Sequence, residues 1–131
     1  MIVVDTSFVV KLLNEEISID LFDSTERFIA PDLFDYEIAS VLWKYSKFES
    51  LDVSVVKKNL LQVKALEIEL QHPEVLEVFL LAKKTGLTAY DASYLLLAQK
   101  HDCMLATCDR ELKKVAKNLG VDVLQLEGKL I

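Results

Sequence analysis

Short apolar runs alternate along this sequence with longer stretches in which apolar residues recur every three or four positions. The runs at Ile2–Val4, Arg27–Ala30 and Cys103–Ala106 have the length of buried strands, and Val121–Leu126 is expected to form a closing strand. The longer stretches predict helices near Thr6–Leu13, Leu33–Phe48, Val53–Leu66, Pro73–Lys84, Ala89–Lys100 and Arg110–Leu119. Short buried strands interleaved with helices predict an α/β sandwich with a mainly parallel central sheet, and the long helical middle is expected to cover one face of it.

The chain has 131 residues, which is the length of one ordinary domain. A chain of this size buries roughly two thirds of its unfolded surface, so it needs no disulfide or metal to fold. It is 52% hydrophobic and 27% charged, with only 3 Gly and 2 Pro, and it contains no repeats or linkers. We therefore expect residues 1–131 to form a single domain.

Nothing in the sequence indicates secretion or membrane insertion. The segment Met1–Asp5 lacks the basic region and apolar core of a signal peptide, and runs such as Val78–Ala82 are too short to span a bilayer. Cys103 and Cys108 have no second Cys or His pair to complete a zinc site, so they are interpreted as buried, reduced thiols. These features favour a cytoplasmic protein without membrane contact.

The formal net charge of −6 argues mildly against nucleic acid as a partner, since most nucleic-acid binders present a basic surface. An acidic protein can still bind RNA if some of its carboxylates hold divalent cations and its lysines are grouped. The choice therefore depends on the candidate functional residues.

Two acids follow predicted strands: Asp5 comes directly after the first, and Asp109 lies just past the strand that ends at Ala106. In open α/β sheets, active sites gather beyond the carboxyl ends of the strands. Both acids also stand where helix N-caps belong, and Asp91, three residues after Thr88, fits a capping box. Each of these three acids thus has a structural alternative to a functional role.

The positions of Glu37 and Asp91 around their predicted helices favour a functional role for both acids. At about 100° per residue, Glu37 lies at the edge of the apolar stripe of its helix, and Asp91 shares a face with Leu95 and Ala98. That stripe comprises Phe34, Ile38, Val41, Leu42 and Tyr45. Burying an unpaired carboxylate is costly, and no Lys or Arg is conspicuous on an inner face to pair with either acid. We therefore favour a functional site over a structural ion pair.

A fold that gathers Asp5, Glu37, Asp91 and Asp109 needs a counter-charge. Two carboxylates ~4 Å apart repel by about 4 kcal/mol at an effective dielectric near 20, so the bare cluster would protonate in part. A divalent cation removes the repulsion, and oxygen ligands without His or Cys select Mg²⁺ or Mn²⁺. Hydrolysis of phosphodiester bonds is the chemistry that suits such a cluster.

Several other classes of enzyme lack support. The three glycines, Gly86, Gly120 and Gly128, look like turn or helix-end residues, so no phosphate-binding loop is present. No Gly-x-Ser-x-Gly motif occurs, and His72 and His101 look like surface residues without a triad partner. A phosphatase or receiver domain would need paired aspartates near the first strand, where only Asp5 stands.

Four segments, in order, resemble the motifs of PIN-domain proteins, in particular the VapC-type toxins of prokaryotic toxin–antitoxin pairs. They are Val4–Val10, Pro31–Ala39, Leu87–Leu95 and Leu105–Leu112, and the third is the most distinctive. The resemblance covers nearly the whole chain, and every acidic position of the motifs is present. The stretch from about Leu51 to Pro73 carries no such signal.

The resemblance implies a PIN-like three-layer α/β/α sandwich and a Mg²⁺- or Mn²⁺-dependent endoribonuclease. By matching motifs, Asp5, Glu37, Asp91 and Asp109 would be the metal-binding and catalytic acids. Thr6, Ser7 and Thr107 would support them as neighbouring polar groups. The resemblance also implies an RNA substrate, a homodimer and a cognate antitoxin that obstructs the acidic pocket. The alternative is an inert PIN-like module that binds RNA or protein without cutting.

Two surface features remain open at this point. Tyr36 and Trp43 lie opposite the apolar stripe of their helix, so either a partner protein or a neighbouring helix of the same chain would cover them. The lysines that precede Gly86 and Gly120 could contact RNA phosphates. A structural role is favoured for them, because cations in the last turn of a helix complement its dipole.

Overall fold

Four short parallel strands form the centre of the molecule. The computed structural model describes residues 1–125, in which β1 (Ile2–Val4), β2 (Phe28–Pro31), β3 (Glu69–Gln71) and β4 (Met104–Ala106) assemble in the order β3-β2-β1-β4. The register pairs Ile2 with Phe28 on one side of β1 and with Met104 on the other. The two central strands are buried along their whole length, as expected of a parallel sheet covered on both faces.

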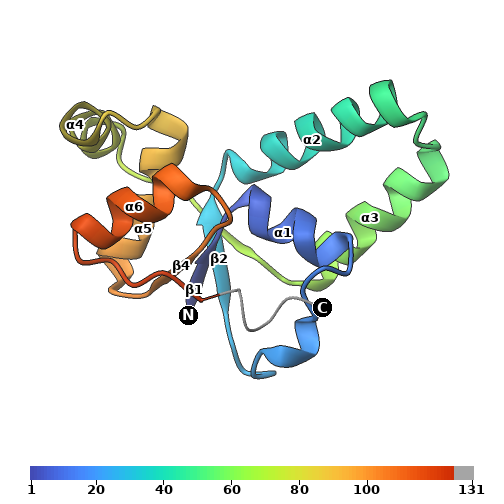
Figure 1. The fold of residues 1–131 in the computed structure, drawn as a ribbon, viewed down its shortest axis with the longest axis horizontal. Coiled ribbons are helices and arrows are strands. Elements are labelled where there is room, and N and C mark those ends of the chain that lie inside the picture. Colours follow the sequence, from blue (N-terminus) through green and yellow to red (C-terminus); the bar gives the residue numbers. More distant parts are fainter. Residues whose placement is uncertain (126–131) are drawn as a thin grey trace.

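Helices cover both faces of this sheet, so the predicted α/β sandwich is confirmed (Figure 1). Their bounds are α1 (Thr6–Leu13), α2 (Phe34–Glu49), α3 (Val53–Ala65), α4 (Val75–Thr85), α5 (Ala89–His101) and α6 (Arg110–Asn118), with a 3₁₀ turn, η1 (Ile19–Leu21). In Figure 1, α1, α2 and α3 lie to one side of the strands and α4, α5 and α6 to the other. No helix within residues 1–125 is long and apolar enough to cross a membrane.

Helix α5 is the central element of its layer. Every residue from Ala92 to Ala98 is buried, because α5 packs on β1, β2 and β4 while α4 and α6 cover its other sides. Its position therefore depends on the sheet and on both neighbouring helices. On the opposite face, α1 inserts Phe8 and Val9 into the core, and the Phe8 ring meets the edge of Phe22, which in turn meets Phe28.

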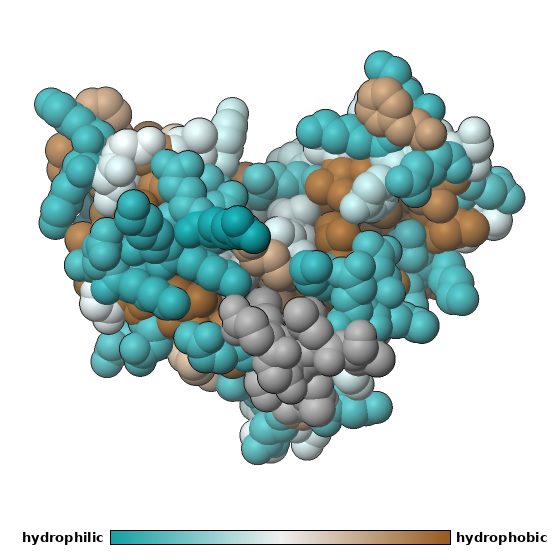
Figure 2. All heavy atoms as spheres, in the orientation of Figure 1, coloured by the Kyte–Doolittle hydropathy of each residue, from teal (hydrophilic) through white to brown (hydrophobic). Residues whose placement is uncertain are grey.

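Helices α2 and α3 form an arm, residues 34–65, that extends away from the sheet (Figure 1). The buried residues of this arm are Phe34, Ile38 and Leu42 of α2, whereas α3 contacts α1 but has no buried residue. The expectation that this helical middle covers one face of the sheet is therefore wrong. Figure 2 shows apolar surface where the arm approaches α1.

The sequence prediction missed β3 and placed a strand where none forms. Strand β3 is an exposed edge with alternating polar residues, which gives a weak apolar signal. The predicted closing strand, Val121–Leu126, is wrong for its described part, and Leu126 lies outside the described residues. Val123 makes a single bridge to Leu105, whose backbone bonds to Asp122 and Leu124. Burial of Val121 and Val123 produced the strand-like alternation.

Candidate functional site

The site lies at the carboxyl ends of β1 and β4. These strands are neighbours, with Val4 opposite Ala106, so the residues that follow them emerge side by side. The backbone amide of Asp5 donates to the Ala106 carbonyl at 3.1 Å, which extends the pairing by one step. Asp5 and the Thr107–Asp109 turn are therefore brought together by strand register.

The Asp5 carboxylate is almost wholly buried and accepts three hydrogen bonds. Its Oδ1 accepts from the Phe8 backbone amide at 3.0 Å, as the N-cap of α1, and from the Ser7 hydroxyl at 2.7 Å. Its Oδ2 accepts from the Thr107 hydroxyl. A carboxylate has about four acceptor positions, so one remains on Oδ2. Asp5 is thus the predicted cap, and it keeps one acceptor position open.

Ser7 and Thr107 join the loops after β1 and β4. The Ser7 hydroxyl also accepts from the Cys108 amide at 2.8 Å, and the Thr107 hydroxyl accepts from the Asp109 amide at 3.1 Å. Each hydroxyl thus donates to Asp5 and accepts from a backbone amide of the loop after β4. This geometry agrees with the supporting role expected for both residues, since it fixes the Asp5 carboxylate without neutralising it.

Glu37 enters the site from the first turn of α2. Its Oε1 accepts from the Tyr94 hydroxyl and from the Thr6 hydroxyl, the latter at 3.4 Å. Burial and the Glu37 carboxylate raise the pKa of Tyr94, so its hydroxyl keeps its proton and acts as the donor. Within residues 1–125, Oε2 of Glu37 has no hydrogen-bond partner.

Asp91 lies in the first turn of α5, and Asp109 is the N-cap of α6. The Asp91 amide donates to Thr88 at 3.1 Å, so the predicted capping interaction forms, but no described residue donates to the Asp91 carboxylate. Asp109 caps α6 by accepting from the Leu112 amide at 2.8 Å. Capping uses only Oδ1 of Asp109, so capping and metal binding are compatible.

The pKa of Asp91 shows that the four acids share one electrostatic environment. Burial raises this pKa from 3.8 to about 6, and repulsion from Asp109, Asp5, Glu37 and Glu111 contributes. Burial also raises the pKa of Asp5, against the effect of its hydrogen bonds. Asp5 and Asp91 are therefore both destabilised in their charged form, which a nearby cation would offset.

No Lys or Arg neutralises this cluster within the described part of the chain. The ion pairs of residues 1–125 all lie elsewhere, for example between Lys11 and Glu16 and between Lys100 and Glu77. The structural alternative considered for Glu37 and Asp91, an ion pair with an inward-facing basic residue, is therefore wrong.

The donor set fits Mg²⁺ or Mn²⁺, because it consists of carboxylate and hydroxyl oxygens. Within residues 1–125, no three acids lie close enough together to enclose an ion as a ready-made cage. Mg²⁺ does not require one, since it retains several waters and is usually held by one or two carboxylates together with substrate phosphates. The open oxygens of Glu37, Asp91 and Asp109 suit that type of site.

A groove leads away from these acids between α1 and α2. Its volume is about 590 Å³, and Thr6, Ser7, Glu37 and Cys108 form its inner end. Its walls are completed by Val10, Lys11, Asn14, Glu16, Ser40, Val41, Lys44 and Tyr45. Val41 and Tyr45, expected in the core stripe of α2, are half-buried in this wall instead.

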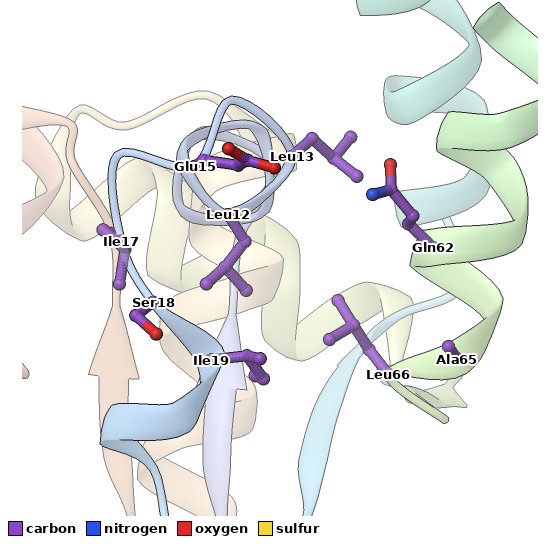
Figure 3. A pocket seen from close by; sticks show the side chains of 9 residues that line it. All are labelled: Leu12, Leu13, Glu15, Ile17, Ser18, Ile19, Gln62, Ala65 and Leu66. Carbon is purple, nitrogen blue, oxygen red and sulfur yellow. The ribbon is translucent and has the colours of Figure 1, made fainter. Parts of the chain in front are cut away.

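A second pocket of about 520 Å³ lies on the other side of α1, facing α3 (Figure 3). Leu12 and Ile19 point toward Leu66 across it, and Glu15 is the only charged residue of its lining. None of the four acids lines it. It therefore lacks the oxygen ligands that hydrolysis of a phosphodiester requires.

Sequence reasoning missed Tyr94 and Glu111. Tyr94 stands among apolar residues of α5 and was given no role of its own, although its spacing of three from Asp91 places both on one face. Glu111 follows Asp109 in the first turn of α6 and adds to the negative field at Asp91. The other chemistry-bearing residues behave as expected: both histidines are exposed, and both cysteines are free, though half-buried rather than buried.

Comparison with known proteins supports the resemblance. The profile of the PIN domain family matches residues 2–118. "Exonuclease VapC9" of Pyrobaculum aerophilum is 37% identical over 89 residues, which are 67% of this chain and 65% of that protein. The alignment thus spans less than two thirds of that relative. "Ribonuclease VapC9" of Mycobacterium tuberculosis is 33% identical over 113 residues, which are 86% of this chain and 88% of that protein.

The crystal structure of PAE2754 from Pyrobaculum aerophilum has a similar fold. The two structures superpose with a TM-score of 0.77 at 30% sequence identity, over 93% of this chain and 89% of that one. Because the superposition covers 93% of this chain, it includes the helical middle of the sequence, where no motif could be recognised.

Replacing Asp91 with Asn is expected to stabilise the metal-free protein near neutral pH. The folded-state pKa of about 6 exceeds the unfolded value of 3.8, so ionised Asp91 lowers the free energy of unfolding. This penalty is complete above pH 6 and absent below about pH 4. Because Asp91 is half-exposed, we discount the penalty to about 1 kcal/mol, or roughly 3 °C in Tm. Thermal unfolding in EDTA at pH 7.5 and pH 4 measures the gain. Asp35→Asn, an exposed acid in the first turn of α2, should gain nothing; equal gains would contradict this account.

Proposed function

Since this chain belongs to the PIN-domain family, we propose that it is a Mg²⁺- or Mn²⁺-dependent endoribonuclease. The observation that carries the proposal is the set of four acids around Asp91, which share one field, lack any described counter-charge and keep open oxygens. The ribonuclease names of the VapC relatives support RNA as the substrate. They also favour the toxin of a toxin–antitoxin pair.

In this proposal, the acids divide the work of hydrolysis. A divalent cation held by these acids would lower the pKa of an attacking water and offset the charge of the scissile phosphate. Asp5 is held rigidly by Ser7 and Thr107, so it presents its remaining Oδ2 position in a fixed direction. Asp91 has no donor of its own among the described residues, so its carboxylate is free to orient that water.

We propose that the RNA strand lies in the groove between α1 and α2. Lys11 is paired with Glu16 at 2.9 Å, whereas Lys44 forms no ion pair with any described residue. An unpaired cation can bind a backbone phosphate, and the half-buried ring of Tyr45 beside it offers a stacking surface for a base. Both groups occupy the groove that ends at Glu37.

We also propose two protein partners on different surfaces. Tyr36 and Trp43 are 80% and 64% exposed, so no described helix of this chain covers them. This face adjoins the groove, and an antitoxin lying on it would obstruct the site. Helix α4 exposes a separate apolar stripe, formed by Val75, Leu76, Phe79 and Leu80. A second copy of the chain, presenting the same stripe, would bury it in a symmetric homodimer.

Metal-dependent cleavage is the first test. Antitoxin-free, metal-stripped protein is expected to cut a mixed RNA pool when Mn²⁺ or Mg²⁺ is added, and Asp91→Asn should lose at least about 100-fold in rate. Mn²⁺ should raise the Tm of the parent and not of Asp91→Asn. Cleavage retained by the variant would show that the site is misplaced. Stabilisation by Mn²⁺ without cleavage would favour the inert binding module instead.

Charge reversal at Lys44 is expected to weaken RNA binding. Loss of one phosphate contact should reduce the affinity of Asp91→Asn protein for single-stranded RNA about tenfold at low salt, with a shallower salt dependence. Fluorescence anisotropy with labelled RNA at several salt concentrations measures both. Lys58→Glu on the exposed face of α3 changes the net charge equally and should have a much smaller effect. Equal effects would place the RNA elsewhere.

Phe79→Asp is expected to abolish the homodimer, because it places a charge in the middle of the apolar stripe of α4. Light scattering during size-exclusion chromatography should report a monomer for this variant and a dimer for the parent. Trp43→Asp, on the face assigned to the antitoxin, should remain dimeric. A dimeric Phe79→Asp protein would show that another surface mediates self-association.

A further inference from the structure

We infer that Tyr94 is a positioning residue that, together with Thr6, fixes the Glu37 carboxylate for metal binding. The Tyr94 side chain is 1% exposed, and its hydroxyl donates to Oε1 of Glu37. The Thr6 hydroxyl donates to the same oxygen at 3.4 Å and lies 3.5 Å from the Tyr94 hydroxyl. Three helices, α1, α2 and α5, thus meet at one carboxylate oxygen.

The two donors contact one oxygen and leave the other available. With Oε1 held by two hydroxyls, Oε2 points where no described residue donates to it. A glutamate has three side-chain torsions, and holding one oxygen removes most of that freedom before a ligand arrives. Hydroxyl donors do this without adding a positive charge, so the carboxylate keeps its full attraction for a cation.

Glu37 needs such a restraint more than the other acids do. Asp5 and Asp109 have shorter side chains, and each is fixed by its hydrogen bond as the N-cap of a helix. Glu37 stands at the beginning of an arm that leaves the sheet and whose buried residues all lie in the first turns of α2. Its hydrogen bond to Tyr94 ties the arm to α5, the best-buried helix of the molecule.

Tyr94 also links Glu37 to Asp91. The two residues of α5 are three positions apart, so they lie on the same helical face about one turn from each other. One rigid helix therefore supplies Asp91 directly and sets the position of Glu37 through the Tyr94 hydroxyl. The inference rests on the proposed function, because it assigns Tyr94 a role in that same metal site.

The test compares Tyr94→Phe with Tyr90→Phe. Both remove one hydroxyl from α5, but Tyr90 is 65% exposed and outside the site. Tyr94→Phe should bind Mn²⁺ about tenfold more weakly in calorimetric titration, while its Tm in EDTA stays within a few degrees of the parent. Tyr90→Phe should match the parent in both measurements. Unchanged Mn²⁺ affinity in Tyr94→Phe would overturn the inference.

Variants of Thr6 provide a second test of the inference if Tyr94→Phe fails to fold. Thr6→Ser keeps the hydroxyl and should retain the parent's Mn²⁺ affinity, whereas Thr6→Ala should weaken it several-fold. Equal affinities for the two variants would show that the hydroxyl does not act on Glu37. A loss in both would show that the Thr6 methyl, and hence packing, is responsible.

A double-mutant cycle separates positioning from general structural support. If Tyr94 acts through Glu37, then Tyr94→Phe should have almost no further effect on Mn²⁺ affinity or cleavage rate in a Glu37→Gln background. Additive losses would overturn the inference and leave the proposed nuclease intact. Failure of the parent itself to bind Mn²⁺ would instead refute the proposed function, and the inference with it.

Discussion

The hydrogen bonds from Ser7 and Thr107 to Asp5 are the interaction on which the site depends. The bond from Ser7 is local, whereas the bond from Thr107 exists because β1 and β4 are adjacent and parallel, so the loops after both strands emerge at the same edge of the sheet. Each hydroxyl donates to the carboxylate and accepts from a backbone amide of the β4 loop. The carboxylate is therefore desolvated and yet well hydrogen-bonded, which keeps it in place at a high electrostatic cost. That cost becomes useful when a cation binds.

Two of the remaining acids divide their carboxylate oxygens in the same way. Glu37 and Asp109 each use one oxygen to fix the side chain and leave the other without a described donor. Structural and functional roles, which look like alternatives in the sequence, are thus carried by different atoms of the same group. Asp91 is the exception, because only its backbone is engaged, and its pKa of about 6 reflects that environment.

Much of this arrangement could be predicted from the sequence because it is local or periodic. The strands before Asp5 and Asp109, and the inward face of α5 that carries Asp91, follow from apolar spacing alone. The gathering of Glu37 with the others required the family resemblance, since no local pattern states that α2 starts beside α1. Strand β3 escaped prediction because an exposed edge strand gives only a weak apolar signal. The helices of the arm were predicted, but the direction in which they leave the sheet depends on contacts distant in sequence. Tyr94 escaped for a different reason: a buried tyrosine in an apolar helix looks like core until its hydroxyl finds a partner.

The acidic net charge, −6, then loses its force as an objection to RNA binding. Long-range repulsion between an acidic protein and RNA is screened at physiological salt beyond about 8 Å, so only charges close to the strand matter. Of the four acids, Glu37 lines the groove, and a divalent cation bound beside it would offset its charge. Along its wall, Lys11 is occupied by Glu16, and Lys44 remains without an ion-pair partner among the described residues. Under the proposed function, the local charge in the groove would therefore depend on metal occupancy, and a metal-free site would repel the same strand that a loaded site attracts. Because Asp91 is destabilised in its charged form, a bound cation would also relieve a folding penalty. Metal binding, RNA binding and stability would then be coupled through one group of four carboxylates.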